Sequence, residues 1–243
     1  DNGSQPMQVR ENGPVIAYNG EVYNFQLLKN ELSLLGHSFR GNSDTEVILH
    51  VYDEWGFDGL KRLEGIFAYA LWDPSIDRLI LMRDRLGVKP LFYADSSMGL
   101  TFGSEIKSLL AAGGVDTSLN DQAFSEYLWY GNTHGDRSFY NGVKALLPGQ
   151  CLIADGNNRR LVYWWRIEEW LESPLGKSNK DEATDMVKQA LDASVKRQLV
   201  ADVPIGIFLS GGVDSSAIAA SAKQSRLNGL NSYSASFDFD KGI

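Results

Sequence analysis

Cysteine and histidine are scarce in this chain of 243 residues, which contains one cysteine and three histidines. One cysteine cannot build a disulfide framework, and three scattered histidines make a zinc site improbable. No apolar run approaches the roughly 18 residues that a membrane-spanning helix requires. Asp1 opens no signal-peptide pattern, so we expect no membrane partner and a reducing, cytoplasmic setting.

Positive charge is also in the minority, with 23 lysines and arginines against 31 acidic residues and a net charge of −8 at pH 7. An acidic chain is repelled by phosphate backbones and anionic lipid surfaces, so we expect no nucleic acid among its main partners. The length is sufficient for a full hydrophobic core and allows one large or two ordinary domains.

Short strand-like and helical patterns arrive in clusters along residues 1–172. The run VIAYNGEVYN alternates and leads into a helix stopped by Gly36, and TEVILHVYDEWG predicts a second helix. Hairpins are predicted within 66–85, 90–105 and 150–165, and further helices within 104–114 and 121–131. Because strands and helices do not strictly alternate, an α+β layered sandwich is expected.

The composition changes in SPLGKSNKDEA, which is rich in Pro, Gly, Ser and charge and has no apolar period. We therefore predict three segments: a first domain over 1–172, a linker over 173–180 and a second domain over 181–243. The second domain starts with a helix over Asp181–Leu199, followed by strand, loop, helix and the apolar run SYSASFDF. This order predicts the start of a parallel α/β domain, and two strands are few for such a sheet. We expect the chain to be a fragment cut within that domain.

The stretch FLSGGVDSSA lies between the apolar run VPIGIFL, which predicts a strand buried on both faces, and a helical pattern. Gly211 and Gly212 permit a tight turn that aims backbone N–H groups and a helix N-terminus at one point, which favours an anion. Asp214 would repel a polyphosphate unless a cation such as Mg²⁺ lay between them. The alternative is plain helix capping. The longer phosphate loop is excluded because no lysine follows the second glycine.

Five segments carry a resemblance to a known family: NGEVYN, GNSDTEVI, RDRLGVKPLFY, FGSEIKSLL and SGGVDSS, in that order. Together they cover essentially the whole chain, which resembles the glutamine-dependent asparagine synthetase family. The resemblance implies a first domain with the fold of an N-terminal-nucleophile amidohydrolase, which releases ammonia from glutamine. It implies a second, adenine-nucleotide-binding domain that uses ATP to adenylate a carboxylate, which the ammonia then attacks.

For glutamine, the resemblance implies that Asn19, Gly20 and Glu21 grip the α-amino and amide ends and that Asp44 pairs with the α-ammonium. A zwitterion in a partly buried site needs such an anion, and Asn19 could also donate to the oxyanion formed when the amide is attacked. Two alternatives stay open. Asn-Gly is a strong hairpin-turn signal, and Asp44 could cap the helix that follows it.

For ATP, the resemblance implies that Leu209 lies by the adenine or ribose, while Asp214 binds Mg²⁺ and the loop holds pyrophosphate. At the end of the second strand, Ala235 and Ser236 would present backbone to the adenine, although SASF departs from the family's usual small-residue pair there. The loop residues given these roles are Ser210, Gly211, Gly212, Asp214, Ser215 and Ser216.

The family's nucleophile is a cysteine at the mature N-terminus, whereas the start of this chain matches a region well inside family members. We therefore expect the nucleophile and the arginine loop that holds the glutamine α-carboxylate upstream of Asp1, and no glutamine hydrolysis by this chain alone. Cys151, in an alternating apolar strand, is predicted to be a buried, inert thiol. Glu105 and Lys107 could line a junction for ammonia or be ordinary surface charges. RDRLGVKP is predicted to shape a buried turn, and Trp164, Trp165 and Trp170 to be core or interface aromatics.

The leading hypothesis is an ATP-dependent ligase of amino-acid biosynthesis that converts aspartate to asparagine, AMP and pyrophosphate, with glutamine as amide-nitrogen donor. A second hypothesis keeps this chemistry but changes the acceptor to a sugar, a peptide or a β-lactam precursor. A third is a non-catalytic glutamine-binding or interaction module. A homodimer is compatible with all three.

Overall fold

The computed structural model describes the chain except residues 1–2, 157, 172–178, 201–202, 226–229 and 237–243. It divides into two compact units, Asp1–Glu172 and Ser173–Ile243, which are considered separately below.

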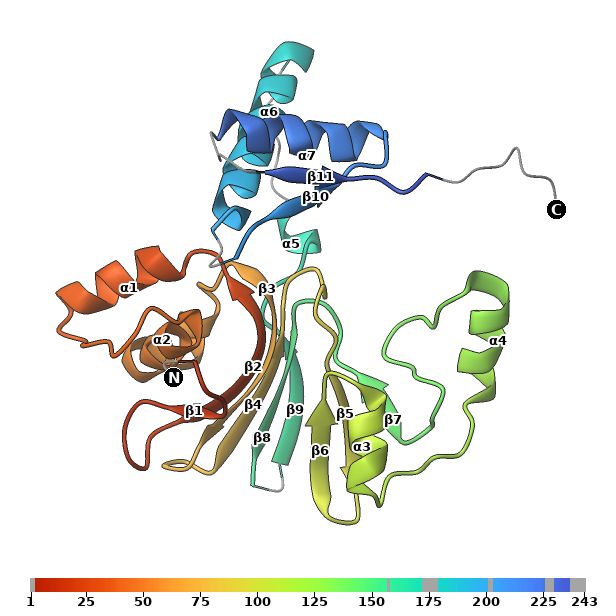
Figure 1. The fold of residues 1–243 in the computed structure, drawn as a ribbon. Coiled ribbons are helices and arrows are strands. Elements are labelled where there is room, and N and C mark those ends of the chain that lie inside the picture. The colour runs from red at the N-terminus through yellow and green to blue at the C-terminus, as the bar shows by residue number, and fades with distance from the viewer. Residues whose placement is uncertain (1–2, 157, 172–178, 201–202, 226–229, 237–243) are drawn as a thin grey trace. The chain divides into compact units, whose positions relative to one another are not determined.

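A six-stranded sheet organises the first unit (Figure 1), and all its neighbouring strands run antiparallel in the order β1-β2-β3-β4-β8-β9. The strands are β1 (Met7–Gln8), β2 (Val15–Val22), β3 (Gly65–Asp73), β4 (Arg78–Arg83), β8 (Gln150–Asp155) and β9 (Asn158–Tyr163). Helices α1 (Phe25–Leu34) and α2 (Asp44–Leu60) bury their apolar residues against this sheet, Leu28 and Leu32 from α1 and Val47 and Ile48 from α2. This helix–sheet core is the largest in the molecule as described.

A second sheet of order β6-β5-β7 packs against the other face, formed by β5 (Phe92–Ser96), β6 (Gly99–Gly103) and β7 (Val143–Ala145). The central strand β3 explains how both faces are filled: Phe67 and Tyr69 belong to the helix-side core, and Ala68 and Ala70 to the core between the sheets. The small side chains of β3 on this second face leave room for the second sheet. Helix α3 (Ile106–Ala112) packs outside the second sheet through Leu109. The four layers form the predicted α+β sandwich.

The three predicted hairpins are present as β3–β4, β5–β6 and β8–β9, and α3 and α4 (Asp121–Tyr130) occupy the predicted helical segments. Two details differ. Helix α2 was expected to end near Gly56 but continues to Leu60, with a break at Gly56, whose φ of 58° suits glycine. Asn19-Gly20 lies inside β2, paired with Ala68 and Phe67 of β3, so the hairpin-turn alternative is wrong.

The second unit contains α6 (Lys180–Gln198), followed by β10 (Gly206–Phe208), α7 (Val213–Gln224) and β11 (Asn231–Tyr233). Helix α6 starts at a capping box formed by Asn179 and Glu182. Strands β10 and β11 are parallel, as the order of elements predicts. The short helix α5 (Glu168–Leu171) ends the first unit.

Strand β10 departs from the expectation of a strand buried on both faces. It is short, and Phe208 is 87% exposed. The physical reason is the limited cover within the described residues, because β10 pairs there with β11 alone. The buried contacts of this unit lie instead between the helices, at Val195 of α6 and Ala222 of α7.

Candidate functional site

The outer edge of β2 between Tyr18 and Val22 carries the first candidate site. Strand β1 pairs only with Val15 and Ile16, so beyond them this edge has no strand partner among the described residues. The Tyr18 N–H donates instead to the side-chain oxygen of Gln5 at 2.6 Å, and the Val22 N–H to Asp44 Oδ2 at 3.0 Å. Because alternate residues of a strand aim their N–H groups at the same edge, that of Gly20 points between these two contacts.

Asp44 is the first residue of α2, and three donors fix its carboxylate. Oδ2 accepts from the Tyr18 hydroxyl at 2.6 Å as well as from Val22, and Oδ1 accepts from the Thr45 N–H at 2.8 Å. The N-cap itself is Ser43, whose hydroxyl accepts from the same Thr45 N–H at 3.2 Å. Asp44 therefore supports the first turn of α2 and also presents a fixed, partly exposed negative charge at the edge of β2.

Tyr18 holds the Asp44 carboxylate of this candidate site, and the sequence does not predict that contact. Burial, together with the Asp44 carboxylate, raises the pKa of Tyr18 far above its usual value, so the phenol stays protonated and donates to Asp44. The alternation of β2 already places Tyr18 and Val22 on one side of the strand. It does not say that a carboxylate from the next helix would meet them.

Asn19 and Glu21 project from the opposite face of β2, and both are exposed. The Asn19 side-chain amide donates to the Ser104 hydroxyl at 3.3 Å, which brings the segment after β6 beside the site. Gly20 has a packing reason to be glycine: a Cβ there would lie 2.2 Å from the Ile66 carbonyl oxygen and 2.6 Å from Phe67 Cα. Three of the predicted glutamine residues thus flank a short stretch of strand edge at Gly20, the fourth, with Asp44 on one side of it and Asn19 and Glu21 on the other.

The second candidate site is the turn between β10 and α7. Gly211 has a φ of 80°, and Gly212 is the N-cap of α7 without a side-chain capping bond. The Ser210 and Ser215 hydroxyls lie 3.2 Å apart, and the Ser216 hydroxyl donates to the Gly212 carbonyl at 2.8 Å. The loop therefore combines a helix N-terminus with a cluster of hydroxyl groups, exposed at Ser210 and Ser216 and half-buried at Ser215, which is a suitable arrangement for phosphate oxygens.

The ends of β10 and β11 bring together two segments that are far apart in the sequence. The Leu209 N–H donates to the Tyr233 carbonyl at 2.8 Å, and the Ser234 hydroxyl donates to the Leu209 carbonyl at 2.5 Å. Ala235 and Ser236 follow directly and are exposed. The residues predicted for the nucleotide thus lie at the carboxyl ends of two parallel strands, where open α/β sheets bind ligands.

Asp214, in the first turn of α7, is the predicted Mg²⁺ ligand and is exposed. No cluster of three or more His, Cys, Asp or Glu side chains suited to a metal occurs within the described part of the chain. Magnesium does not require such a cluster, because it is commonly held by one or two carboxylates, water and substrate phosphates. A single carboxylate beside the serine hydroxyls of this loop therefore fits Mg²⁺ bound together with a nucleotide.

Cys151 is buried, as predicted, and the RDRLGVKP segment forms a turn. Cys151 is fully buried, and burial raises the pKa of its thiol to about 12. Asp84 is 1% exposed and accepts from the backbone N–H groups of Leu86, Val88 and Lys89, each at 3.0 Å. Together these contacts make Asp84 the buried centre of a tight turn. Leu86 and Val88 on that turn are 72% and 53% exposed, so the prediction of a buried turn is wrong except at Asp84, because the carboxylate draws the backbone N–H groups inward and leaves these side chains outside.

The remaining residues singled out in the sequence lie as follows. Trp164 is buried and stacks near Phe67, and Trp165 is half-buried, whereas the side chain of Trp170 lies outside what the structure describes. Glu105 and Lys107 are exposed and form an ion pair of 2.6 Å with each other. No helix in the described part of the chain is both long enough and apolar enough to cross a membrane.

The chain is similar to known proteins along nearly all of its length. A family model for a glutamine amidotransferase domain matches residues 1–165, and one for asparagine synthase matches residues 186–242. Asparagine synthetase [glutamine-hydrolyzing] 3 of Bacillus subtilis is 39% identical over 225 residues, covering 91% of this chain and 36% of its own length. Amidase chry2 of Gibberella zeae is 34% identical over 218 residues, covering 89% of this chain and 32% of its own.

Among solved structures, a glutamine phosphoribosylpyrophosphate amidotransferase from B. subtilis aligns with a TM-score of 0.46 at 18% identity, covering 96% of this chain and 48% of the other. The chain spans about a third of the length of the curated relatives named above.

Proposed function

We propose a function on the basis of the family. The chain belongs to the glutamine amidotransferase domain family, and that domain is followed by the start of an asparagine synthase domain. The enzyme that carries this chain is proposed to be an ATP-dependent ligase. It takes ammonia from glutamine, adenylates aspartate and forms asparagine, AMP and pyrophosphate. The named relatives include an asparagine synthetase, which supports this acceptor. ATP, glutamine and aspartate are the proposed substrates.

The observation that carries the glutamine part of the proposal is the carboxylate of Asp44 at the edge of β2. Its two oxygens accept from Tyr18, Val22 and Thr45, so its position is set before any ligand arrives. A preformed anion at a strand edge suits the α-ammonium of glutamine, and the strand edge offers backbone groups to the rest of the zwitterion. Asn19, on the opposite face, is proposed to donate to the oxyanion of the attacked amide. The nucleophile is proposed to be a cysteine outside residues 1–243.

The nucleotide part rests on the loop between β10 and α7. The reaction requires stabilisation of the leaving group. Attack of a carboxylate on the α-phosphorus expels pyrophosphate, and its growing negative charge needs hydrogen-bond donors that are already in position. The N-terminus of α7 and the hydroxyls of Ser210, Ser215 and Ser216 would supply them. Leu209, Ala235 and Ser236 would contact the adenine or ribose from the strand ends. Asp214 would hold Mg²⁺, whose chemistry is to neutralise phosphate charge.

Separate loss of the two half-reactions tests this proposal. In the enzyme that carries this chain, Asp214→Ala should abolish ATP-dependent synthesis with either glutamine or ammonia and leave glutamine hydrolysis largely intact. Ser210→Ala should be milder, because one hydroxyl donor to a charged acceptor contributes about 1–3 kcal/mol. Equal loss of hydrolysis and synthesis in Asp214→Ala would indicate misfolding and contradict the assignment of Asp214.

A second acceptor class has an observation in its favour, because one of the relatives is named an amidase of a fungus rather than an asparagine synthetase. The same ATP chemistry would then amidate another carboxylate, such as a sugar acid, a peptide or a β-lactam precursor. Pyrophosphate release measured with aspartate and with a panel of carboxylates discriminates the two. Release that depends on aspartate supports the first proposal, and release only with another carboxylate replaces it.

A further inference from the structure

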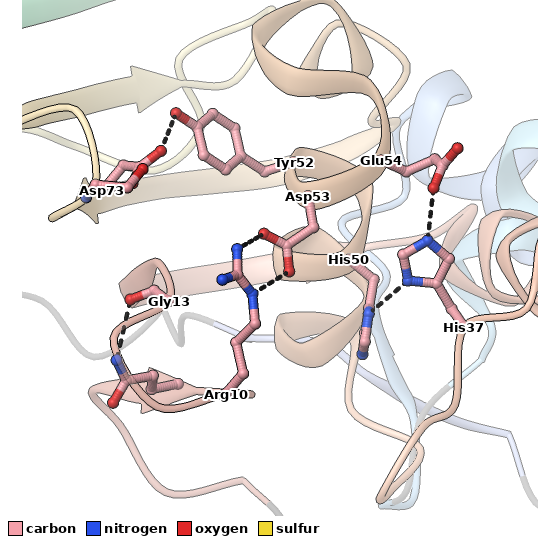
Figure 2. Close-up of polar contacts among 10 residues, drawn as sticks. Arg10, Gly13, His37, His50, Tyr52, Asp53, Glu54 and Asp73 are labelled. Carbon is pink, nitrogen blue, oxygen red and sulfur yellow. Dashed lines mark hydrogen bonds and ion pairs between the residues drawn. The ribbon is translucent and has the colours of Figure 1, made fainter.

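His37 and His50, two of the three histidines of the chain, form a pair in the first unit (Figure 2), in which His50 is buried and His37 is half-buried. Nδ1 of His37, which follows α1, lies 2.9 Å from Nδ1 of His50 on α2, and Nε2 of His37 lies 2.8 Å from Glu54 Oε2. His50 is 9% exposed, and its Nε2 has no hydrogen-bond partner among the described residues. Glu46 Oε1 is 4.0 Å from this nitrogen. A buried polar atom without a partner costs free energy, so the pair needs an explanation.

The hydrogen bonds determine which nitrogens carry protons when both rings are neutral. A carboxylate only accepts, so Nε2 of His37 must carry the proton that is donated to Glu54. Nδ1 of neutral His37 is then an acceptor, and the bond between the rings requires the proton on Nδ1 of His50. This leaves Nε2 of His50 as a bare lone pair facing the carboxylate of Glu46. The neutral pair therefore contains one buried acceptor that faces another acceptor.

Carboxylates near the pair partly offset the cost of burying a positive charge there. Glu46, Asp53 and Glu54 face the pair from α2 itself. The cationic groups nearby are already engaged: Arg10, after β1, donates to Asp53 at 2.9 Å, and Lys29 of α1 donates to the Gly41 carbonyl at 2.7 Å. Arg40, beside Glu46, has interactions of its own. The pKa of His50 is nevertheless lowered, chiefly by burial and then by His37, which outweigh Glu46 and Asp53. A positive charge on the pair is therefore disfavoured at His50, which leaves His37, beside Glu54, to carry it.

We propose that His37, His50 and Glu46 form a one-proton relay that positions the turn preceding Asp44. One proton enters at Nε2 of His50, and the proton on Nδ1 of His50 moves to Nδ1 of His37. The product is an imidazolium at His37, paired with Glu54, and a neutral His50 whose Nε2–H faces Glu46. Protons and charge balance, since one proton is gained and one positive charge appears. The unpartnered atom of the neutral state becomes a donor aimed at an acceptor.

Glu46 connects this proton to the candidate site. It is 4% exposed and accepts from the backbone N–H of Arg40 at 2.7 Å and of Gly41 at 2.9 Å, in the turn that leads to Asp44. A third donor from His50 would hold Glu46, and with it this turn, more firmly. His37, His50 and Glu46 are thus positioning residues, which act through the turn and do not touch the substrate. Their effect on glutamine rests on the function proposed above.

Nuclear magnetic resonance of the histidine rings in the 243-residue chain tests the relay without reference to activity. At pH 8, His50 should carry its proton on Nδ1 and His37 on Nε2. On acidification the pair should gain one proton at a single midpoint, with Nε2 of His50 becoming protonated. The amide signals of Arg40 and Gly41 should shift at the same midpoint. Exposed His134 is the internal control, and His134→Gln assigns its signals without altering the pair. A proton on Nε2 of His50 at pH 8, or unmoved Arg40 and Gly41 amides, would overturn the proposal.

Glu54→Gln provides the matched perturbation, because it removes the anion that stabilises the His37 imidazolium and conserves shape. The midpoint should fall by about one pH unit, the lower end of what an adjacent opposite charge contributes. In the enzyme that carries this chain, KM for glutamine should be several-fold lower at pH values below the midpoint than above it, with ammonia-driven synthesis as reference. Glu54→Gln should shift the pH at which KM changes by the same amount as it shifts the midpoint. If Glu54→Gln moves the midpoint but not the pH at which KM changes, the positioning role is overturned. Failure of the proposed function would be distinguishable from this, because synthesis by the wild-type enzyme would then not depend on glutamine at any pH.

Discussion

Replacing Asp44 by asparagine tests whether its charge binds glutamine or only supports α2. The substitution keeps the shape of the side chain but turns one acceptor oxygen into a donor amide. In the structure three donors meet the carboxylate, so the new amide must face either Thr45 or the pair formed by Tyr18 and Val22. The Thr45 N–H already has a second acceptor, the Ser43 hydroxyl, so the amide should turn toward Thr45. The bonds from Tyr18 and Val22 are then retained.

The expected magnitudes follow from this count. One bond to a charged acceptor is lost, but its donor keeps Ser43 as a partner, so we expect a stability loss near the lower end of 1–3 kcal/mol, about 1 kcal/mol. Loss of the charged, partly buried partner of its ammonium group should weaken the binding free energy of glutamine by about 1.5–3 kcal/mol. This raises KM for glutamine roughly 10- to 150-fold. Free ammonia needs no such partner, so ammonia-driven synthesis should remain.

The assay is the ratio of glutamine-dependent to ammonia-dependent synthesis in the enzyme that carries this chain, with thermal unfolding as a check on folding. Tyr18→Phe is the matched control, because it removes one donor to Asp44 and leaves the charge. Its effect on glutamine use should stay below about tenfold, consistent with one hydrogen bond. If the ratio in Asp44→Asn equals that of wild type, Asp44 supports α2 only and the binding role is refuted.

Two further predictions concern the fold around the site. In a denaturant titration, Gly20→Ala should lower the free energy of unfolding by more than about 3 kcal/mol, because the new Cβ would meet backbone atoms of β3 that cannot move aside. Gly36 is the control, since it has a φ of 98° but open space around it. Gly36→Ala should lower the free energy of unfolding by only about 1 kcal/mol. Cys151, with its pKa raised to about 12, is a neutral thiol at pH 8 and should react with a thiol reagent only after the chain unfolds; rapid reaction of the native chain would contradict its burial.

The sequence was sufficient for much of the fold because its periodicities are strong. The hairpins around Pro74, Ser96–Gly99 and Asp155–Asn158 combine alternating strands with turn residues, and all three form. The order of layers required more, since Phe67 and Ala68 are both apolar and the alternation does not say which face meets helices. In β3, side-chain size separates the two faces: Phe67 and Tyr69 face the helices, and Ala68 and Ala70 face the second sheet.

Local signals misled where a tertiary contact overrode them. Asn-Gly is a hairpin signal because both residues tolerate a positive φ, yet here the glycine serves the close approach of β3 to β2. The apolar run over 203–209 indicates a fully buried strand, but burial depends on neighbouring strands, and in the described chain β10 has one. In both places the deciding partner lies more than 20 residues away along the chain.

The candidate site shows why function was more predictable than positioning. The sequence motifs contain the groups that would touch substrates, such as Asp44 and the loop at Ser210, because the chemistry restricts which residue types can serve. The groups that hold Asp44 in place are a phenol on a strand and, through Glu46, a histidine pair on and before a helix. Nothing in their local patterns distinguishes them from core residues. Their roles appear only when the folded chain leaves a donor, an acceptor or a charge that must be matched, as at Nε2 of His50.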